Sequence, residues 1–326
     1  MPEPRTPWTA EQLPDLAGRT IVVTGANSGL GWETALGLAR KRATVVLACR
    51  NAESGTAAAA RIGSIAPAAA VEVLTLDLAS LASIRAFAEA FRARHRALDV
   101  LINNAGVMAL PHRTTADGFE MHIGTNHLGH FALTGLLADR LLAAARPRVV
   151  TVSAGFYRIG RIHFDDLHWQ RRRYRSMLAY GQSKLANLLF MFELQRRADA
   201  AGVPLLSVAS HPGYAATNLQ FAGPRMRGSA LLARLMSVSN RWFSQSAAMG
   251  ALPTLCAAGA PEVRGGQYFG PDGFAEMWGH PTVVGCNAAA SDREAARRLW
   301  EVSEKLTGVT YATLARGGAA ASASAR

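Results

Sequence analysis

A tyrosine and a lysine stand four residues apart in the segment Tyr180-Gly181-Gln182-Ser183-Lys184. In a helix, this spacing places the phenol and the ammonium on one face. A nearby positive charge favours the phenolate, so Lys184 is expected to lower the pKa of Tyr180 toward neutral pH. Tyr180 is therefore a candidate to give a proton to a carbonyl oxygen or to take one from an alcohol.

A glycine-rich loop, residues 24–31, lies between the first predicted strand and the first predicted helix. Glycines at this spacing permit a tight turn and let backbone N–H groups approach a pyrophosphate, while the following helix offers its N-terminal dipole. A glycine-rich turn without a ligand is the alternative interpretation. The candidate cofactor contacts of this loop are Gly25, Asn27, Ser28, Gly29, Leu30 and Gly31.

The residues that end the second and third predicted strands bear on the choice of nucleotide. A site for NAD usually has a carboxylate at the end of the second strand, which binds the ribose 2′-hydroxyl, but Arg50 follows the strand here. A guanidinium suits a 2′-phosphate, so NADP(H) is favoured, with a solvated arginine as the alternative. Asp77, beside Leu78 at the end of the third strand, is placed to accept a hydrogen bond from an adenine amine.

The elements that must position these residues alternate in type along the first 210 residues. Short apolar strands alternate with longer helical segments, a pattern typical of a parallel sheet covered on both faces. With right-handed crossovers this predicts an α/β fold, a doubly wound parallel sheet of the Rossmann type. The predicted strands are 20–24, 44–48, 71–76, 100–102, 148–152 and 205–209, and the clearest helices are 31–42, 81–94 and 180–199.

No linker divides the chain, so we expect one domain over 15–311, with an N-terminal extension over 1–14. The small-residue tail, 312–326, is expected to be disordered. Residues 214–262 break the alternation as a helical insertion before the last strand-like run, Gln267-Tyr268-Phe269. The insertion is placed either to cover a substrate crevice or to add two more core helices.

The net charge of +12 first indicates a polyanionic partner, but its distribution argues against nucleic acid. Only three of the 35 basic residues are lysine, and the arginines are scattered, as in a chain with a composition bias. The densest cluster, Arg171-Arg172-Arg173-Tyr174-Arg175, has one aromatic residue and no repeat. We therefore expect no nucleic-acid partner.

Cysteine spacing and hydropathy indicate the compartment. Cys49, Cys256 and Cys286 form no CxxC pair, so no zinc site or disulfide framework is expected and a reducing, cytoplasmic location fits best. His127 and His130 could be read as metal ligands, but no third ligand is evident, so packing is favoured and no metal is expected. No uncharged apolar stretch approaches 18 residues, so no membrane span is expected.

Together these segments resemble the short-chain dehydrogenase/reductase family from about residue 15 to 311. Residues 24–31 resemble its TGxxxGxG loop, Asn103-Asn104-Ala105-Gly106 its NNAG motif, and Tyr180 with Lys184 its YxxxK motif. The segments 48–50, 125–131, 183–187 and 268–273 are most similar to the retinol-dehydrogenase-like branch. Animal members of that branch often carry a membrane-anchoring N-terminus. We expect this chain to be a soluble, bacterial member without one.

The resemblance implies roles for the matching residues. Tyr180 is the general acid/base, Lys184 lowers its pKa and holds the nicotinamide ribose, and Asn126 positions a water in a proton relay. Asn104, Ala105 and Gly106 lie beside the adenosine ribose, and Pro212, Gly213 and Thr217 border the nicotinamide. The branch generally prefers NADP(H). Family members are commonly dimers or tetramers, so a homo-oligomer is implied without a fixed number of copies.

One position departs from the family pattern. The family usually carries a serine at the end of the fifth strand, and our alignment places Ala154 there, one residue after Ser153. Losing one hydrogen-bond donor to the reacting oxygen costs on the order of 1–3 kcal/mol. Either Ser153 replaces the hydroxyl through a local shift, or the enzyme is weakened, or the protein is an inactive NADP(H)-binding sensor or scaffold.

The sequence thus predicts an NADP(H)-dependent oxidoreductase that transfers a hydride between nicotinamide and the carbonyl or alcohol carbon of a hydrophobic substrate. The hydrophobic character is inferred from the apolar 214–262 segment. The alternative is the catalytically weakened or inactive NADP(H)-binding protein.

Overall fold

The computed structural model describes residues 7–214 and 245–314. Their centre is an eight-stranded sheet with the strand order β3-β2-β1-β4-β5-β6-β7-β8, in which β8 alone runs antiparallel to its neighbour. The predicted doubly wound parallel sheet is therefore confirmed. The strands are β1 (Thr20–Thr24), β2 (Thr44–Cys49), β3 (Val71–Thr75), β4 (Val100–Asn103), β5 (Arg148–Val152), β6 (Leu206–Ser210), β7 (Tyr268–Pro271) and β8 (Pro281–Val283).

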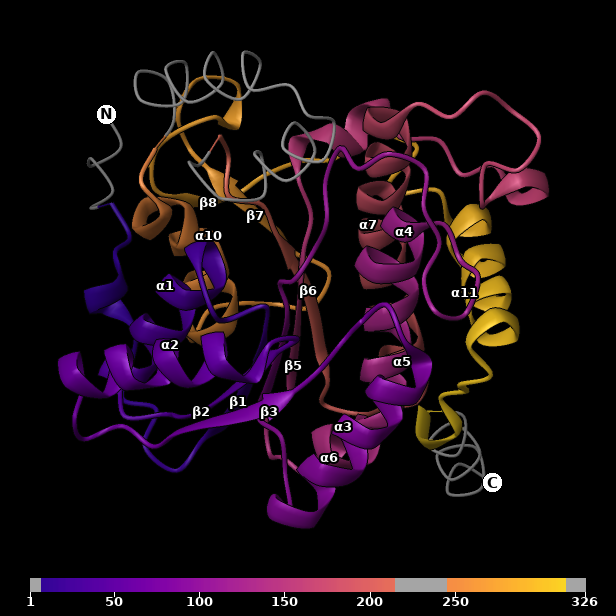
Figure 1. The fold of residues 1–326 in the computed structure, drawn as a ribbon. Coiled ribbons are helices and arrows are strands. Elements are labelled where there is room, and N and C mark those ends of the chain that lie inside the picture. The colour runs from indigo at the N-terminus through magenta and orange to yellow at the C-terminus, as the bar shows by residue number, and fades with distance from the viewer. Residues whose placement is uncertain (1–6, 215–244, 315–326) are drawn as a thin grey trace, which may run out of the picture.

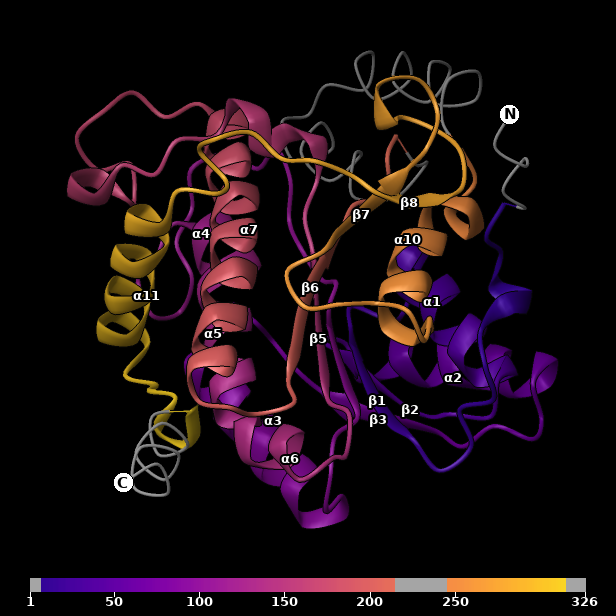
Figure 2. The same ribbon diagram turned by 180° about the vertical axis from the view of Figure 1, so that it is seen from behind.

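Helices cover both faces of the sheet (Figures 1 and 2). On one face lie α1 (Gly29–Arg40), α2 (Ala52–Ile65) and α10 (Ala247–Gly259). On the other lie α3 (Leu81–Arg94), α5 (Gly129–Leu136) and α7 (Ser176–Ala200), with α11 (Arg293–Thr307) packed outside α7. The central strands are thus buried on both sides, which explains why they read as continuous apolar runs such as Ile21-Val22-Val23.

The helix that begins at Met121 changes its hydrogen-bond pattern partway along. α4 (Met121–Ile123) continues into a π-helical turn, η2 (Gly124–Leu128), and then into α5. In that turn the N–H of Gly129 donates to the carbonyl oxygen of Gly124, five residues back. Turns of this kind are rare and frequently lie at functional sites. This one carries Asn126.

The structure differs from the sequence-based expectations at the end of the sheet and at the chain ends. The antiparallel strand β8 was not expected, and α7 begins at Ser176 rather than at Tyr180. Leu13 and Leu314 are buried, so the packed core reaches a few residues beyond 15–311 on each side. Residues 315–326 of the expected tail lie outside the described residues.

The expected insertion over 214–262 is described only in part, because residues 215–244 lie outside the described part of the chain. Its described helix, α10, packs against α1 and against β5, β6 and β7. Its apolar residues, including Leu252, Leu255 and Cys256, are buried in the core. For α10, the structure therefore favours the core-helix interpretation over a substrate cover.

Candidate active site

A cavity of about 220 Å³ opens where β1, β2, β3 and β4 end. The carboxyl ends of parallel strands meet at one edge of a sheet, which is where open α/β sheets bind their ligands. The cavity brings together seven of the predicted cofactor contacts, namely Gly25, Asn27, Arg50, Asp77, Leu78, Ala105 and Gly106. Ser28, Gly29, Leu30 and Gly31 lie just beside it, at the start of α1.

The glycine loop fits closely against its surroundings. A Cβ atom at Gly31 would lie 2.4 Å from the carbonyl oxygen of Gly25 and 2.6 Å from Nδ2 of Asn104. Gly25 has a φ of +67°, which a side chain would strain. Only glycine fits at these two positions, and the loop therefore presents bare backbone at the N-terminus of α1.

The two strand-end residues predicted to contact the nucleotide, Arg50 and Asp77, both line this cavity. Arg50 is exposed at the end of β2, beside Asn51 and Ser54 at the start of α2. Within the described residues, no carboxylate pairs with its guanidinium. Asp77 already accepts a hydrogen bond of 2.9 Å from the N–H of Ala79 through Oδ1. Its other oxygen keeps its capacity to accept.

Asn104 joins the ends of β4 and β1. Its Nδ2 donates to the carbonyl oxygen of Thr24 at 2.7 Å, and its N–H donates to Thr24 Oγ1 at 2.9 Å. Thr24 Oγ1 also lies 2.9 Å from Nε2 of His130, whose Nδ1 lies 3.0 Å from the carbonyl oxygen of Asn126. Burial lowers the pKa of His130 to about 4, so the ring is neutral and can donate through Nδ1 while accepting through Nε2.

His127, the other histidine of the pair, is bonded elsewhere. Its Nε2 lies 2.8 Å from Oγ of Ser303 on α11, and burial lowers its pKa to about 3. His127 and His130 thus contact different elements, and each has a structural partner.

Tyr180 lies on α7 with a 4% exposed side chain, and its ring meets the rings of Phe156 and His122 edge-on. Its hydroxyl has no hydrogen-bond partner among the described residues. Burial raises the pKa of Tyr180 above its ordinary value. The expected net lowering of this pKa is therefore wrong for this structure, because the loss of solvation sets the direction of the shift.

Lys184 lies one turn after Tyr180, as predicted, but it faces the end of β5. Its Nζ donates to the carbonyl oxygen of Val152 at 3.0 Å and lies 5.7 Å from the centre of the Tyr180 ring. Asn187 Nδ2 donates to the same carbonyl at 3.1 Å. Burial lowers the pKa of Lys184 to about 8, so a modest change in its surroundings changes its charge.

Asn126 is held in place by the backbone of the loop after β4. Its Oδ1 accepts from the N–H of Val107 at 2.7 Å, and its Nδ2 donates to the carbonyl oxygen of Val107 at 3.0 Å. Nδ2 also donates to Ser183 Oγ at 2.9 Å, and Ser183 in turn donates to the carbonyl of Tyr180. Asn126 thus fixes the turn of α7 that carries Tyr180, with one lone pair of Oδ1 left to accept a further bond.

The Ser153 hydroxyl does not take the place of the missing catalytic serine. Its Oγ donates to the carbonyl oxygen of Lys184 at 2.9 Å, and the residue is buried. Ala154 follows in extended conformation and carries only a methyl group. Of the three accounts of this position, the local shift of Ser153 is therefore contradicted by the geometry.

The predicted nicotinamide-bordering residues follow β6. Gly213 has a φ of +60°, and a Cβ there would lie 2.5 Å from the carbonyl oxygen of Met277. The carbonyl oxygen of Pro212 accepts from Gln245 Nε2 at 2.6 Å. This turn lies at the same sheet edge as the end of β5. Thr217 lies outside the described residues.

Sequence reasoning missed several residues of the site. The cavity is also lined by Ala48, Asn51, Ser54, Leu76, Val107 and Thr125. Behind Tyr180, Glu120 Oε1 lies 2.7 Å from Nδ1 of His122 and 3.0 Å from the hydroxyl of Tyr174. Burial alone would raise the pKa of Glu120, but hydrogen bonds from His122 and from backbone N–H groups lower it. No short motif signals this buried polar group.

Comparison with known proteins defines the class of protein. Residues 19–166 match the model of the short chain dehydrogenase family. Human retinol dehydrogenase 13 is 43% identical over 297 residues, which cover 90% of this chain and 86% of that protein. Mouse retinol dehydrogenase 12 is 43% identical over 305 residues, covering 93% and 90%.

Solved structures of similar proteins support the same class. The crystal structure of an uncharacterized protein from Mycobacterium paratuberculosis has a TM-score of 0.78 and 47% identity, covering 94% of this chain and 99% of that one. A NAD(P)-dependent gluconate 5-dehydrogenase from Beutenbergia cavernae with bound NADP has a TM-score of 0.60 and 27% identity, covering 78% and 95%.

The chain therefore belongs to the short-chain dehydrogenase family, in its retinol-dehydrogenase-like branch. It is an oxidoreductase of a family that uses nicotinamide cofactors. Among residues 7–214 and 245–314, no helix is long and apolar enough to cross a membrane.

Proposed function

We propose that this protein is an NADP(H)-dependent oxidoreductase that transfers a hydride between nicotinamide and the carbonyl or alcohol carbon of a hydrophobic substrate. The observation that carries the proposal is the state of the Tyr180 hydroxyl. The polar groups around it are engaged in hydrogen bonds with one another and with the backbone, whereas this hydroxyl has no partner among the described residues. It is thus available to a substrate oxygen.

The cavity at the ends of β1 to β4 offers contacts that suit the phosphates and the adenine of a dinucleotide. The bare backbone of Gly25 and Gly31 and the N-terminus of α1 would hold the pyrophosphate. Arg50, with Asn51 and Ser54 beside it, offers the positive charge and the donors that a 2′-phosphate needs. Asp77 would accept from the adenine amine. When bound, the cofactor supplies or accepts the hydride.

The residues of this chain would handle the proton. Burial holds Tyr180 in its neutral form, so its O–H can donate to a carbonyl oxygen that becomes an alkoxide. In the reverse direction the phenol must lose its proton first, and the ammonium of Lys184 would stabilise the phenolate. Asn126 and Ser183 keep the turn of α7 that carries Tyr180 in place.

Two apolar side chains near Tyr180 support a hydrophobic substrate. Phe156 and Ile159 lie on η3 (Gly155–Ile159), the short helix that follows β5, and are 43% and 48% exposed. The Phe156 ring centre lies 5.8 Å from that of Tyr180. Large apolar side chains left exposed beside a reactive group are typical of a substrate-binding wall.

The test is the oxidation of NADPH and of NADH against a panel of apolar aldehydes and ketones. We expect turnover with NADPH, weaker turnover with NADH, and loss of turnover in Tyr180→Phe. NADPH binding without turnover, in the wild-type protein and in Ala154→Ser alike, would contradict the proposal and favour a cofactor-binding sensor or scaffold.

A further inference from the structure

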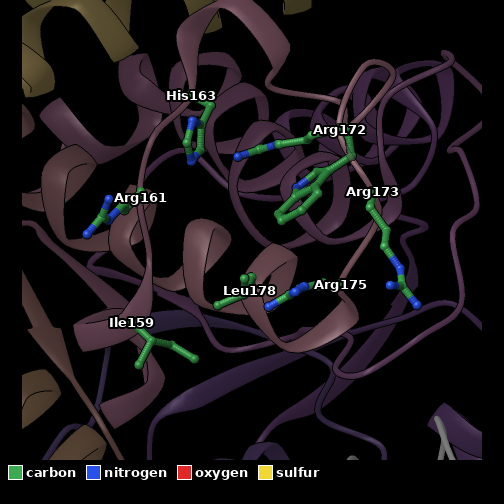
Figure 3. A pocket seen from close by; sticks show the side chains of 8 residues that line it. Ile159, Arg161, His163, Arg172, Arg173, Arg175 and Leu178 are labelled. Atoms are coloured by element: carbon green, nitrogen blue, oxygen red, sulfur yellow. The ribbon is translucent and has the colours of Figure 1, made fainter.

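A second cavity, of about 360 Å³, lies between the end of η3 and the start of α7. Figure 3 shows the labelled side chains around it, and most of them are basic. They are Arg161, His163, Arg172, Arg173 and Arg175. The cavity shares no lining residue with the one at the ends of β1 to β4, so it is a separate site.

The positive charge of this arginine pocket is largely uncompensated. Arg172 pairs with Asp166, with its Nε 3.3 Å from Oδ2. Within the part of the chain that the structure describes, no carboxylate lies within ion-pair distance of Arg161, Arg173 or Arg175. Three guanidinium groups around one cavity repel one another, and an anion between them removes that repulsion.

One arginine is fixed in place before any ligand arrives. The Arg172 guanidinium lies 3.6 Å from the centre of the Trp169 ring, and its NH2 group donates to Gln182 Oε1 at 2.9 Å. Trp169 is itself buried. A guanidinium that is already ordered loses little entropy when it binds an anion, so Arg172 is pre-organised for binding.

The helix α7 adds to the field in the pocket. Arg175 is the residue directly before its first turn, and Leu178 lies within that turn. The positive end of the dipole of this 25-residue helix therefore faces the same cavity as the arginines.

The pocket shares a wall with the site of Tyr180. Ile159 lines the pocket at the end of η3, whose Phe156 contacts the Tyr180 ring. Leu178 lines it from α7, two residues before Tyr180. A Cβ at Gly160 would lie 2.3 Å from the carbonyl oxygen of Gly181, so the end of η3 packs tightly on this part of α7.

We propose that the arginine pocket binds an anionic group, a phosphate or a carboxylate, beside the active site. Four guanidinium groups match the oxygens of such a group, and Ile159 and Leu178 accommodate an apolar chain attached to it. The anion comes either from the far end of an elongated substrate or from a separate small molecule, and the two arms of the test distinguish these sources.

The first arm measures binding without any catalysis. Sodium pyrophosphate is titrated calorimetrically into the full-length chain. The glycine loop proposed to hold the cofactor pyrophosphate is unchanged in every variant compared, so a difference in affinity between variants reports on the arginine pocket. We expect binding that Arg173→Gln/Arg175→Gln weakens at least about tenfold. The matched control Arg94→Gln/Arg96→Gln removes the same charge at the other end of the sheet and should leave the affinity unchanged.

Absence of binding, or equal affinity in the pocket variant and the control, overturns the proposal. Arg161→Gln reaches the pocket from a different segment, and it should also weaken binding. It therefore tests anion binding by the pocket independently if the double substitution disturbs the start of α7. Thermal unfolding of each variant separates a lost site from a lost fold.

The second arm identifies the source of the anion, and it alone rests on the proposed function. NADPH oxidation is measured with decanal and with 10-oxodecanoic acid, which differ only by a terminal carboxylate. If the substrate supplies the anion, Arg173→Gln/Arg175→Gln lowers kcat/KM for the oxo acid at least about tenfold and leaves decanal unchanged. If both substrates respond alike, the anion is a separate molecule. If neither aldehyde reacts, the proposed function fails. The pyrophosphate titration still shows whether the arginine pocket binds an anion.

Discussion

The hydroxyl of Ser153 donates a hydrogen bond of 2.9 Å to the backbone carbonyl oxygen of Lys184. This bond joins the end of β5 to α7, one turn beyond Tyr180. It uses the only hydrogen of the Ser153 hydroxyl. Because side chains alternate along an extended chain, the next position, Ala154, is the one that can face a substrate, and it carries no donor.

Ala154→Ser should restore a donor to the reacting oxygen. We expect kcat/KM to rise roughly 5- to 150-fold, which corresponds to about 1–3 kcal/mol. Steady-state kinetics on any aldehyde that the wild-type protein reduces would measure it. Ser153→Ala is the matched variant, and it should lower the free energy of unfolding by about 1 kcal/mol with little change in kcat. A large loss of kcat in Ser153→Ala, with stability unchanged, would show that the Ser153 hydroxyl takes part in catalysis.

Tyr180→Phe should separate activity from stability. The hydroxyl that it removes has no partner among the described residues, so the free energy of unfolding should change by less than about 1 kcal/mol. The rate of NADPH oxidation should fall at least about 100-fold, since a general acid is lost. Tyr174→Phe is the control, because its hydroxyl donates to groups such as the carbonyl of Leu110 and should cost stability. Equal rates in Tyr180→Phe and the wild-type protein would exclude Tyr180 as the acid.

Arg50→Gln should reduce the preference for NADPH. One charge-assisted contact to a phosphate is worth about 1.5–3 kcal/mol, so the Kd of NADPH should rise roughly 10- to 150-fold. The Kd of NADH should change little, because NADH has no 2′-phosphate. Titrations followed by nicotinamide fluorescence would give both constants. Arg40→Gln, at the end of α1, removes an exposed arginine elsewhere and should have no effect.

The lowered pKa of Lys184 predicts a particular dependence of stability on pH. Its pKa is about 8 in the folded protein against an ordinary value of 10.5, so between these values the unfolded chain binds more protons. Stability should therefore rise with pH from about 8 to 10, by up to about 3 kcal/mol from this group. Lys184→Met should lack this rise, whereas Lys305→Met, an exposed control, should retain it. The measurement is denaturant unfolding of the three proteins at several pH values. If the free energy of unfolding of all three depends on pH in the same way, the lowered pKa of Lys184 is refuted.

Most of the sheet could be predicted because its strands are buried on both faces and read as apolar runs. β8 (Pro281–Val283) could not, because it is a short edge strand whose exposed residues have no periodicity. Arg50 and Asp77 could be placed at this cavity because a strand end fixes where its next residue lies. Val107 and Thr125 were missed because only the folded chain brings their loop and helix to the same cavity.

The electrostatics were harder to predict than the positions. The spacing of Tyr180 and Lys184 was correct, but the sequence could not show that both are buried, and burial reverses the expected direction of the Tyr180 pKa. The arginines of residues 161–175 looked like scattered charge for a related reason. Their side chains come from irregular segments, and they surround one cavity only after η3 and α7 have packed together.

The π-helical turn over Gly124–Leu128 makes the helix between Met121 and Leu136 sensitive to an added residue, because the turn already holds one residue more than an α-helical turn. Each residue of an α-helix turns the chain by about 100°. Adding one residue between Asn126 and His130 would rotate Asn126 away from Val107 and Ser183 relative to His130, which anchors the following part of the helix to Thr24. Substitutions within this helix can be absorbed by repacking, but the insertion of a single codon there separates His130 from the site that it supports.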